Sequence, residues 1–361
     1  MKKFAAILAA CLLLSLCACS PKTETPDTPP DDGDVQLALL RQTELTSPLE
    51  LAEGQYVDVL DYAEGEALLS VSHGVDAPEG SSDISTRYTD YLLRWRLDGP
   101  TERLEPARGG YISSALCDGK TLLYVEQNGD RWALLRSSDG EKQTLRSSDE
   151  MDLLRVPELF RVGKTTMLLC QTRQGAAVFL VSGDTIQTRL ELPGWVARET
   201  SPCSNGTMYM FFGSPAGSDE TSLLLCDSSG LRWQIPLDRA TSGGAINQNC
   251  ALVSLRQVKG GGYGYLVVNL TNGSTNTVDS DKPLYCLSGS GNTFLYVDEG
   301  YNAYLLYPDA RNSAPVTFHQ LASYHNWPML FHSDGASSYL LQVDISEGEH
   351  QGTHFWRLDN P

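Results

Sequence analysis

The sequence predicts an all-β protein, and two features of the chain after residue 34 support this fold class. Apolar runs of five to eight residues alternate with turns rich in Gly, Asn, Asp and Ser, as expected for short antiparallel strands. No long stretch has the three-to-four-residue apolar spacing of an amphipathic helix. Residues 35–361 are numerous enough for one large β domain or for two smaller domains.

A repeat near 43 residues predicts a β-propeller. The motif Gly119-Lys120-Thr121 leads into an apolar run, and related turn-and-strand segments recur along the chain. Each unit has room for four strands, which is what a propeller blade needs. A pair of β-sandwiches is the alternative, but sandwiches do not predict a constant step between matching motifs. We therefore expect seven four-stranded blades, with copies of the motif at residues 65–69, 119–124, 163–169, 205–210, 249–253, 291–296 and 335–340.

The turns also predict the order of strands within a unit. An inner strand precedes the strand that begins at the motif, a third strand ends in a turn such as Asp139-Gly140, and a polar outer strand such as 101–105 follows. The last unit stops after its third strand, at residues 353–358. We expect the N-terminal part of the domain to supply the missing outer strand and close the ring, with residues 36–40 and 45–51 as candidates.

One insertion breaks the period. Residues 72–83 lengthen the first unit by roughly ten residues and are rich in Gly, Ser, Asp and Pro. We expect them to form an exposed loop.

The first twenty residues have the pattern of a secretory signal. Lys2 and Lys3 precede an apolar run over residues 4–16, which only Ser15 interrupts. A helix over residues 4–18 would span about 22 Å, whereas the hydrocarbon core of a bilayer is roughly 30 Å thick. The sequence therefore favours a cleaved signal over a transmembrane helix.

The end of this segment, Leu16-Cys17-Ala18-Cys19, resembles the lipobox of bacterial lipoproteins. The resemblance implies a signal peptide over residues 1–18, cleavage before Cys19, and lipidation of Cys19 with diacylglyceryl and a further acyl chain such as palmitate. Cys17 is the alternative acceptor, but Leu16 then occupies the position where the signal peptidase requires a small side chain. Because two or more chains hold a protein stably at a bilayer, we expect a lipid-anchored protein on the extracytoplasmic face of the cell membrane.

A polar segment follows the lipobox. Residues 19–34 contain four prolines, five acidic residues and one lysine. Proline and like charges both extend a chain, so this segment is predicted to be a tether between the lipid and the domain at 35–361.

The chain is acidic, with a formal net charge of −18. Removal of residues 1–18 takes away two lysines and no acid, so the mature chain is more acidic still. Such a charge argues against nucleic acid and anionic lipid surfaces as partners. It indicates a solvated surface, with an acidic cation site as the alternative.

Six cysteines remain after Cys19, and their number permits disulfides in an exported protein, with 15 possible connectivities. They are spread over the whole domain, most lie in apolar runs, and none forms a CxxC motif. We therefore expect free, buried thiols at Cys117, Cys170, Cys203, Cys226, Cys250 and Cys286.

No catalytic, cofactor-binding or metal-binding motif is present, and we predict no catalytic residue, cofactor or metal ligand. Five histidines fall in the last 43 residues, but no two have the spacing that a metal site on one strand needs. The 6 Trp and 16 Tyr could line a sugar site, although most propeller aromatics pack between blades. The histidines concerned are His319, His325, His332, His350 and His354.

Together these features predict a non-enzymatic module of the cell envelope that binds a protein or a glycan, or serves as a scaffold. The alternative is an extracellular glycan hydrolase or lyase with carboxylates around the central channel. Fold alone does not decide between them, because propellers host both binding and catalysis.

Overall fold

The computed structural model describes residues 40–75, 86–97, 99–106, 109–198, 201–256, 262–308, 313–315, 329–345 and 352–360. Residues Leu39–Pro361 form one compact unit. The described residues form strands and turns, and none of them belongs to a helix that could span a bilayer. The expected signal peptide, Cys19 and the tether lie outside the described residues.

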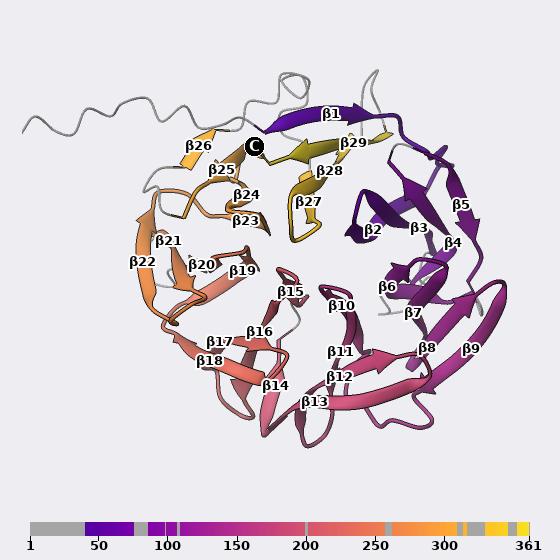
Figure 1. The fold of residues 1–361 in the computed structure, drawn as a ribbon, viewed down its shortest axis with the longest axis horizontal. Helices are drawn as coiled ribbons and strands as arrows, with labels where there is room; N and C mark the ends of the chain where they lie inside the picture. The colour runs from indigo at the N-terminus through magenta and orange to yellow at the C-terminus, as the bar shows by residue number, and fades with distance from the viewer. Residues whose placement is uncertain are drawn as a thin grey trace, which may run out of the picture. The chain divides into compact units, whose positions relative to one another are not determined.

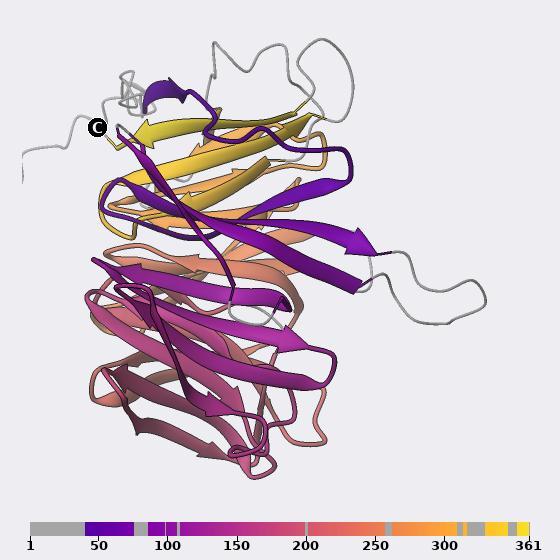
Figure 2. The same cartoon turned by 90° about the vertical axis from the view of Figure 1, so that its right-hand side faces the viewer.

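The structure confirms the all-β, seven-bladed propeller. Seven antiparallel sheets are arranged in a ring as its blades (Figure 1), and in all but the last the strands follow one another in the sequence. Six sheets have four strands each, and the sheet of blade 4 has a fifth because its innermost strand is split into two short pieces. Figure 2 shows the strands running from one face of the ring to the other.

The two inner strands of each blade are joined by the repeated turn. The innermost strands are β2 (Gln55–Ala63), β6 (Tyr111–Asp118), β10 (Glu158–Val162), β14 (Trp195–Ala197) with β15 (Cys203–Ser204), β19 (Ala240–Ile246), β23 (Tyr285–Ser290) and β27 (Met329–Ser333). The second strands are β3 (Glu66–Val75), β7 (Thr121–Asn128), β11 (Thr165–Gln171), β16 (Met208–Pro215), β20 (Cys250–Arg256), β24 (Thr293–Val297) and β28 (Ser338–Ile345).

The two outer strands complete each blade in the predicted order. The third strands are β4 (Thr86–Arg96), β8 (Arg131–Ser138), β12 (Gly175–Ser182), β17 (Thr221–Asp227), β21 (Tyr263–Asn269), β25 (Ala303–Leu306) and β29 (Gly352–Asp359). The fourth strands are β5 (Thr101–Leu104), β9 (Glu141–Ser147), β13 (Thr185–Pro193), β18 (Gly230–Leu237), β22 (Thr275–Ser280), β26 (Ser313–Pro315) and, in blade 7, β1 (Arg41–Leu45).

The N-terminal part of the domain closes the ring, as predicted. Strand β1 pairs with β29 of the last blade, from Arg41 opposite Asp359 to Leu45 opposite Phe355. The strand itself lies between the two candidate segments. Of the second candidate, only Leu45 is in the strand, and the leucines that follow, Leu49 and Leu51, instead pack against the core of blade 1.

The predicted loop at residues 72–83 is wrong at its start. Residues 72–75 belong to β3, because Ser72 and His73 pair with both β2 and β4, and Ser72 is fully buried. Strands β3 and β4 are 10 and 11 residues long, the longest in the structure, and extend beyond their neighbours at one face (Figure 2). Residues 76–83 lie outside the described residues.

The repeated motif forms the turn between the first and second strands. Its glycine has a positive φ, for example 59° at Gly163 and 54° at Gly291, which glycine adopts without steric cost. The weaker copy in blade 5 has no glycine. There the side chain of Asn247 accepts hydrogen bonds from the backbone N–H groups of Asn249 and Cys250 and so makes the turn itself.

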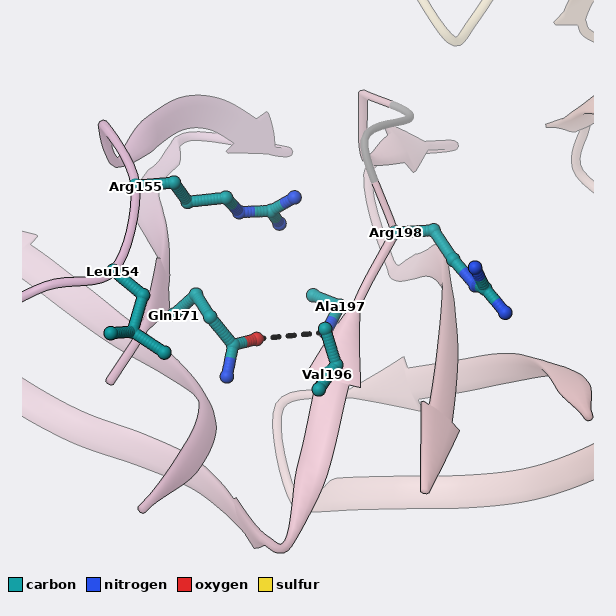
Figure 3. A pocket seen from close by; sticks show the side chains of 6 residues that line it. All are labelled: Leu154, Arg155, Gln171, Val196, Ala197 and Arg198. Atoms are coloured by element: carbon teal, nitrogen blue, oxygen red, sulfur yellow. Dashed lines mark hydrogen bonds between the residues drawn. The ribbon is translucent and has the colours of Figure 1, made fainter. Parts of the chain in front are cut away.

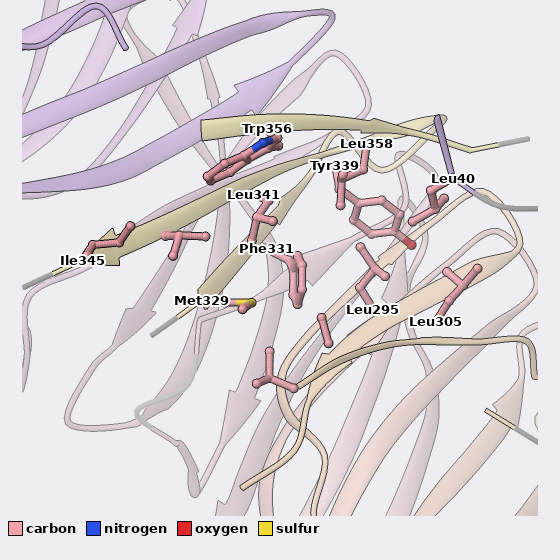
Figure 4. Packing of buried hydrophobic residues seen from close by; sticks show 13 residues of the cluster. Leu40, Leu295, Leu305, Met329, Phe331, Tyr339, Leu341, Ile345, Trp356 and Leu358 are labelled. Atoms are coloured by element: carbon pink, nitrogen blue, oxygen red, sulfur yellow. The ribbon is translucent and has the colours of Figure 1, made fainter. Parts of the chain in front are cut away.

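The core lies between blades as well as within them. One buried cluster joins Leu295 and Leu305 of blade 6 to Leu341, Tyr339 and Trp356 of blade 7 (Figure 4). Apolar side chains on one blade therefore bury those of the next, so each blade depends on its neighbours for a dry interior.

Candidate functional site

The ring has two faces with different connections. We call the face that carries the repeated turns the turn face, and the opposite one, where the innermost strands begin and the second strands end, the loop face. The segments that pass from one blade to the next also lie at the loop face. Residues that share a face can meet although they are far apart in the sequence.

The innermost strands of all seven blades line a central cavity of about 480 Å³. Its wall includes the charged side chains of Asp61, Glu158, Arg161 and Asp334, together with several serines. A cavity of this size and polarity has room for water or a small polar ligand.

Turns from opposite sides of the ring meet at the turn-face end of this cavity. A Cβ atom added to Gly163 of blade 3 would lie 2.7 Å from the backbone oxygen of Gly206 in blade 4. A Cβ on Gly335 of blade 7 would lie 3.4 Å from the backbone oxygen of Ser204. The turns of blades 3, 4 and 7 are therefore in close contact here.

A shielded ion pair holds three blades together near the same end. Arg161 of blade 3 donates from Nη2 to Asp61 of blade 1 at 2.6 Å and to the carbonyl oxygen of Cys117 in blade 2 at 2.7 Å. The Asp61 and Arg161 side chains are only 12% and 21% exposed. These two hydrogen bonds link blades 1, 2 and 3 to one another.

Two further titratable groups line the cavity without an ion pair. Burial raises the pKa of Glu158, and a hydrogen bond from Ser201 and the nearby Arg155 offset only part of that rise. Burial lowers the pKa of His332 to about 4, so the ring is neutral at neutral pH, and its Nε2 has no hydrogen-bond partner among the described residues. Asp61 and Asp334 are held by other groups of the fold, so the cavity does not present two free carboxylates.

A second cavity, of about 460 Å³, opens at the loop face between blades 3 and 4. We call it the arginine pocket; its lining residues (Figure 3) are Leu154, Arg155, Gln171, Val196, Ala197 and Arg198. Gln171 fixes its floor. The side-chain amide accepts a hydrogen bond from the N–H of Ala197 at 2.8 Å and donates to the carbonyl oxygen of Trp195 at 3.2 Å, as a neighbouring strand would.

The two arginines of the pocket form no ion pair with the described residues, although Arg155 lies near Glu158. Arg155 makes no hydrogen bond or ion pair with any of them, and Figure 3 shows its side chain extending over the pocket. Arg198 leaves from the opposite edge, and its side chain points away from Arg155 (Figure 3), where its Nε donates to the Ser214 hydroxyl at 2.9 Å. No described carboxylate lies within ion-pair distance of either guanidinium.

Exposed apolar side chains gather on the loop face. Of the six large apolar side chains of the described part that are exposed, only Leu231 lies elsewhere, at the turn that opens β18. Three of the others occupy the second position of a first strand of a blade. The five loop-face residues are Tyr56, Leu154, Val196, Tyr301 and Leu330.

Tyr301 is held out from the loop face by a rigid turn. Its φ is 56°, an unfavourable value for a bulky residue. The carboxylate of Asp298 stabilises the turn by accepting hydrogen bonds from the backbone of Gly300 and Asn302 and from the Tyr304 hydroxyl. A strained, exposed aromatic residue is more often found at a functional surface than elsewhere.

The six cysteines after Cys19 are free thiols in the structure. Cys170, Cys226 and Cys250 are buried, as predicted, and burial raises the pKa of Cys170 and Cys226 to about 12. The prediction of burial is wrong for Cys286, which is exposed, and only partly right for Cys117 and Cys203. Cys286 lies at a bulge of β23, where its side chain leaves the regular in-and-out alternation.

The histidines are not brought together in the described part. His332 lines the central cavity, and His354 stacks on Trp356 in β29. His319, His325 and His350 lie outside the described residues. Over the described ranges, no group of three or more His, Cys, Asp or Glu side chains has the arrangement of a metal site.

The arginine pocket was not predicted from the sequence. Arg155 and Arg198 are 43 residues apart, one repeat of the chain. Residues one repeat apart lie at similar heights on adjacent blades, so a search for like charges at that spacing would have found this pair.

Neither a protein-family model nor a curated protein sequence matches the chain. Solved propellers match its structure. YCF48 from Cyanidioschyzon merolae is 13% identical, with a TM-score of 0.54 over 88% of this chain and 98% of that one. YCF48 bound to D1 peptide is 11% identical, with a TM-score of 0.53 over 89% and 96%.

A prolyl endopeptidase structure is also similar, with 12% identity and a TM-score of 0.55. The match covers 84% of this chain but 47% of that one, so this chain spans about half of its length. At these identities the similarity supports the propeller fold and nothing more specific.

Proposed function

We propose that this chain is a non-enzymatic, protein-binding lipoprotein of the bacterial cell envelope, anchored through Cys19 and presenting its loop face to a partner. The observation that carries the proposal is that five of the six large exposed apolar side chains of the described part lie on that face, in five different blades. Apolar and aromatic residues at the surface of a rigid scaffold are typical of protein interaction sites.

Other observations support this proposal. The lipobox-like motif supports anchoring, and the acidic tether that follows it would hold the ring away from the bilayer. A propeller of similar fold has been solved with a bound peptide. The hydrolase alternative is less well supported, because glycosidases need two available carboxylates and the central cavity supplies only Glu158.

Site-specific photo-crosslinking in cells tests which face binds. A benzophenone amino acid replaces Tyr301 or Tyr56 on the loop face, and Leu231 serves as the matched control because it is exposed but lies elsewhere. We expect a discrete crosslinked protein from positions 56 and 301 and none from position 231. Equal crosslinking from all three positions, or none from any, would contradict the proposal. Retention on isolated cell-wall glycan without a protein crosslink would assign the face to a glycan instead.

Metabolic labelling with palmitate tests the anchor. We expect Cys19→Ser to abolish labelling and to release the protein from the membrane fraction, whereas Cys17→Ser retains both. Full labelling of Cys19→Ser would mean that the lipid acceptor has been misassigned.

A further inference from the structure

We propose that the arginine pocket binds an acidic peptide segment of the partner, with an aliphatic side chain between its carboxylates. The inference rests on the proposed protein-binding function and names the chemistry that the loop face recognises. The pocket supplies three elements for such a ligand: a fixed floor, an apolar wall, and two guanidinium groups, that of Arg155 over the pocket and that of Arg198 beyond its far edge (Figure 3).

The floor of the pocket is pre-organised. Gln171 is 4% exposed, and its amide is fully engaged with the backbone of Trp195 and Ala197 and with the carbonyl oxygen of Thr172. The backbone N–H of Leu154 donates to the carbonyl oxygen of Gln171 at 2.8 Å, which fixes the opposite wall. The floor at Gln171 and the wall at Leu154 are therefore already in place before a ligand binds, so little ordering of the protein is needed on binding.

The charge of the pocket selects for an anion. Of the neighbouring carboxylates, Asp152 pairs with Arg173 at 2.5 Å, and Glu158, which lies near enough to Arg155 to feel its charge, forms no ion pair with it. Arg155 has no such partner among the described residues, and Arg198 leaves its terminal nitrogens available after bonding Ser214 through Nε. A guanidinium with free nitrogens can hold a carboxylate through two parallel hydrogen bonds.

The apolar wall favours a peptide over an inorganic anion as the ligand. Leu154 is 60% exposed and Val196 is 41% exposed, and both belong to the lining of the pocket. Neither would be covered by an inorganic anion. An extended peptide that crosses from Arg155 to Arg198 would place an aliphatic side chain against them and a carboxylate near each guanidinium.

A random heptapeptide display library, selected on the full-length protein in detergent, tests the inference. We expect enrichment of peptides in which Asp or Glu flanks Leu, Ile or Val. The double variant Arg155→Gln/Arg198→Gln should lose this enrichment, and a selected peptide should bind it at least tenfold more weakly in fluorescence polarisation. Replacing the acids of that peptide by their amides should have the same effect.

Arg173→Gln is the matched control. Arg173 is a nearby loop-face arginine, but it is already paired with Asp152, so its removal should leave the selected peptide bound. Arg198→Lys should retain part of the affinity, since it keeps the charge but loses the planar fork. Thermal unfolding of each variant shows whether it has kept its fold.

Several outcomes would overturn the inference. Enrichment of neutral or basic peptides would do so, as would equal enrichment on the double variant. Binding of oligogalacturonate that depends on both arginines, with no peptide enriched, would assign the pocket to acidic glycans. Photo-crosslinks from position 301 that persist in the double variant, without acidic enrichment, would leave the proposed function standing and refute this pocket alone.

Discussion

The turn face and the loop face are built from the same strands but differ in how their surface groups are used. On the turn face, polar groups of neighbouring blades bind one another: Asn205 donates to the carbonyl oxygen of Asn247, and Asn249 donates to Asn292. On the loop face, Leu154, Val196 and Tyr301 remain exposed, and Arg155 has no partner among the described residues.

This difference suggests separate roles for the two faces: the turn face stabilises the ring, and the loop face recognises the partner. Side chains that bridge blades on the turn face have little freedom to change partners, because each is already bound to the neighbouring blade. The loop face can vary in sequence without breaking the ring, as expected of loops on a rigid scaffold. We therefore expect substitutions on the turn face to reduce stability and substitutions on the loop face to reduce binding.

We expect the largest difference in loss of stability when two ion pairs with similar N–O distances are broken. Asp61 and Arg161 lie 2.6 Å apart and are 12% and 21% exposed, whereas Asp152 and Arg173 lie 2.5 Å apart and are 68% and 74% exposed. Burial raises the pKa of the Asp61 carboxyl despite Arg161, but Asp61→Asn leaves the shielded guanidinium without its counter-charge and should lower the free energy of unfolding by about 3 kcal/mol. Asp152→Asn should cost less than about 1 kcal/mol.

Urea unfolding measures both variants. Equal losses of unfolding free energy in Asp61→Asn and Asp152→Asn would mean that burial does not distinguish the two ion pairs. The proposal that the turn face stabilises the ring while the loop face binds the partner would then be wrong. In the double variant Asp61→Leu/Arg161→Met no charge is left unpaired, so it should regain much of the lost stability.

A second contrast isolates the contact between turns. Gly163 and Gly183 have similar φ values, 59° and 55°, but a Cβ on Gly163 would lie 2.7 Å from the Gly206 oxygen while one on Gly183 meets nothing within 4 Å. Replacement by Ala costs about 1 kcal/mol at either position because of the left-handed backbone. Gly163→Ala should cost about 2 kcal/mol more, since blades 3 and 4 must separate.

Thermal unfolding of the two alanine variants checks this expectation. If Gly183→Ala is as destabilising as Gly163→Ala, the backbone conformation explains both losses and the contact between the turns contributes little.

The same turns explain why the fold could be predicted from the sequence. A left-handed turn favours glycine, so Gly119, Gly163 and Gly291 recur with the spacing of the blades. Ring closure could be predicted because the last unit lacked an outer strand, but the first and last residues of the closing strand could not. The leucines after Arg41 have the same pattern whether they form a strand or pack as a coil, and only the packing distinguishes the two.

The candidate site could not be predicted in the same way. Arg155 and Leu154 lie in the segment that enters blade 3, and Val196 and Arg198 belong to the start of blade 4. No local pattern marks either segment, because the pocket exists only where adjacent blades meet. The 43-residue spacing of Arg155 and Arg198 is a signal that could have found the pair, but it does not show that Leu154 and Val196 line the same pocket.

A third contrast compares two tyrosines. Tyr339 is fully buried, and its hydroxyl accepts a hydrogen bond from the backbone of Ser290 at 2.9 Å and lies 2.9 Å from the Thr293 hydroxyl. Tyr339→Phe removes the acceptor of the Ser290 N–H, while the Thr293 hydroxyl keeps Ser290 and Asn360 as partners, and should cost about 1.5 kcal/mol. Tyr301→Phe, at an exposed loop-face position, should change stability by less than about 0.5 kcal/mol.

The smallest expected effect is a difference in pH dependence between Asp334 at the turn face and Glu158, whose strand begins at the loop face. Burial alone would raise the pKa of Asp334, but hydrogen bonds from the backbone N–H groups of residues 336–338 and from the Ser338 hydroxyl hold it below the usual 3.8. The stability it contributes is therefore fully present above pH 3.8 and lost as the pH falls through the folded-state pKa. Asp334→Asn should be destabilising at neutral pH, and the loss should shrink below pH 3.8.

Glu158 should behave in the opposite sense, because burial raises its pKa above the usual 4.5. Its carboxylate costs stability above the folded-state pKa, and that cost disappears as the pH falls to 4.5 and below, where the folded and unfolded chains are both protonated. Glu158→Gln should therefore stabilise the protein at neutral pH and have no effect in acid. Urea unfolding of both variants at several pH values measures the two trends. If both variants lose stability at neutral pH, Glu158 is held by partners as Asp334 is, and the contrast between the faces does not extend into the central cavity.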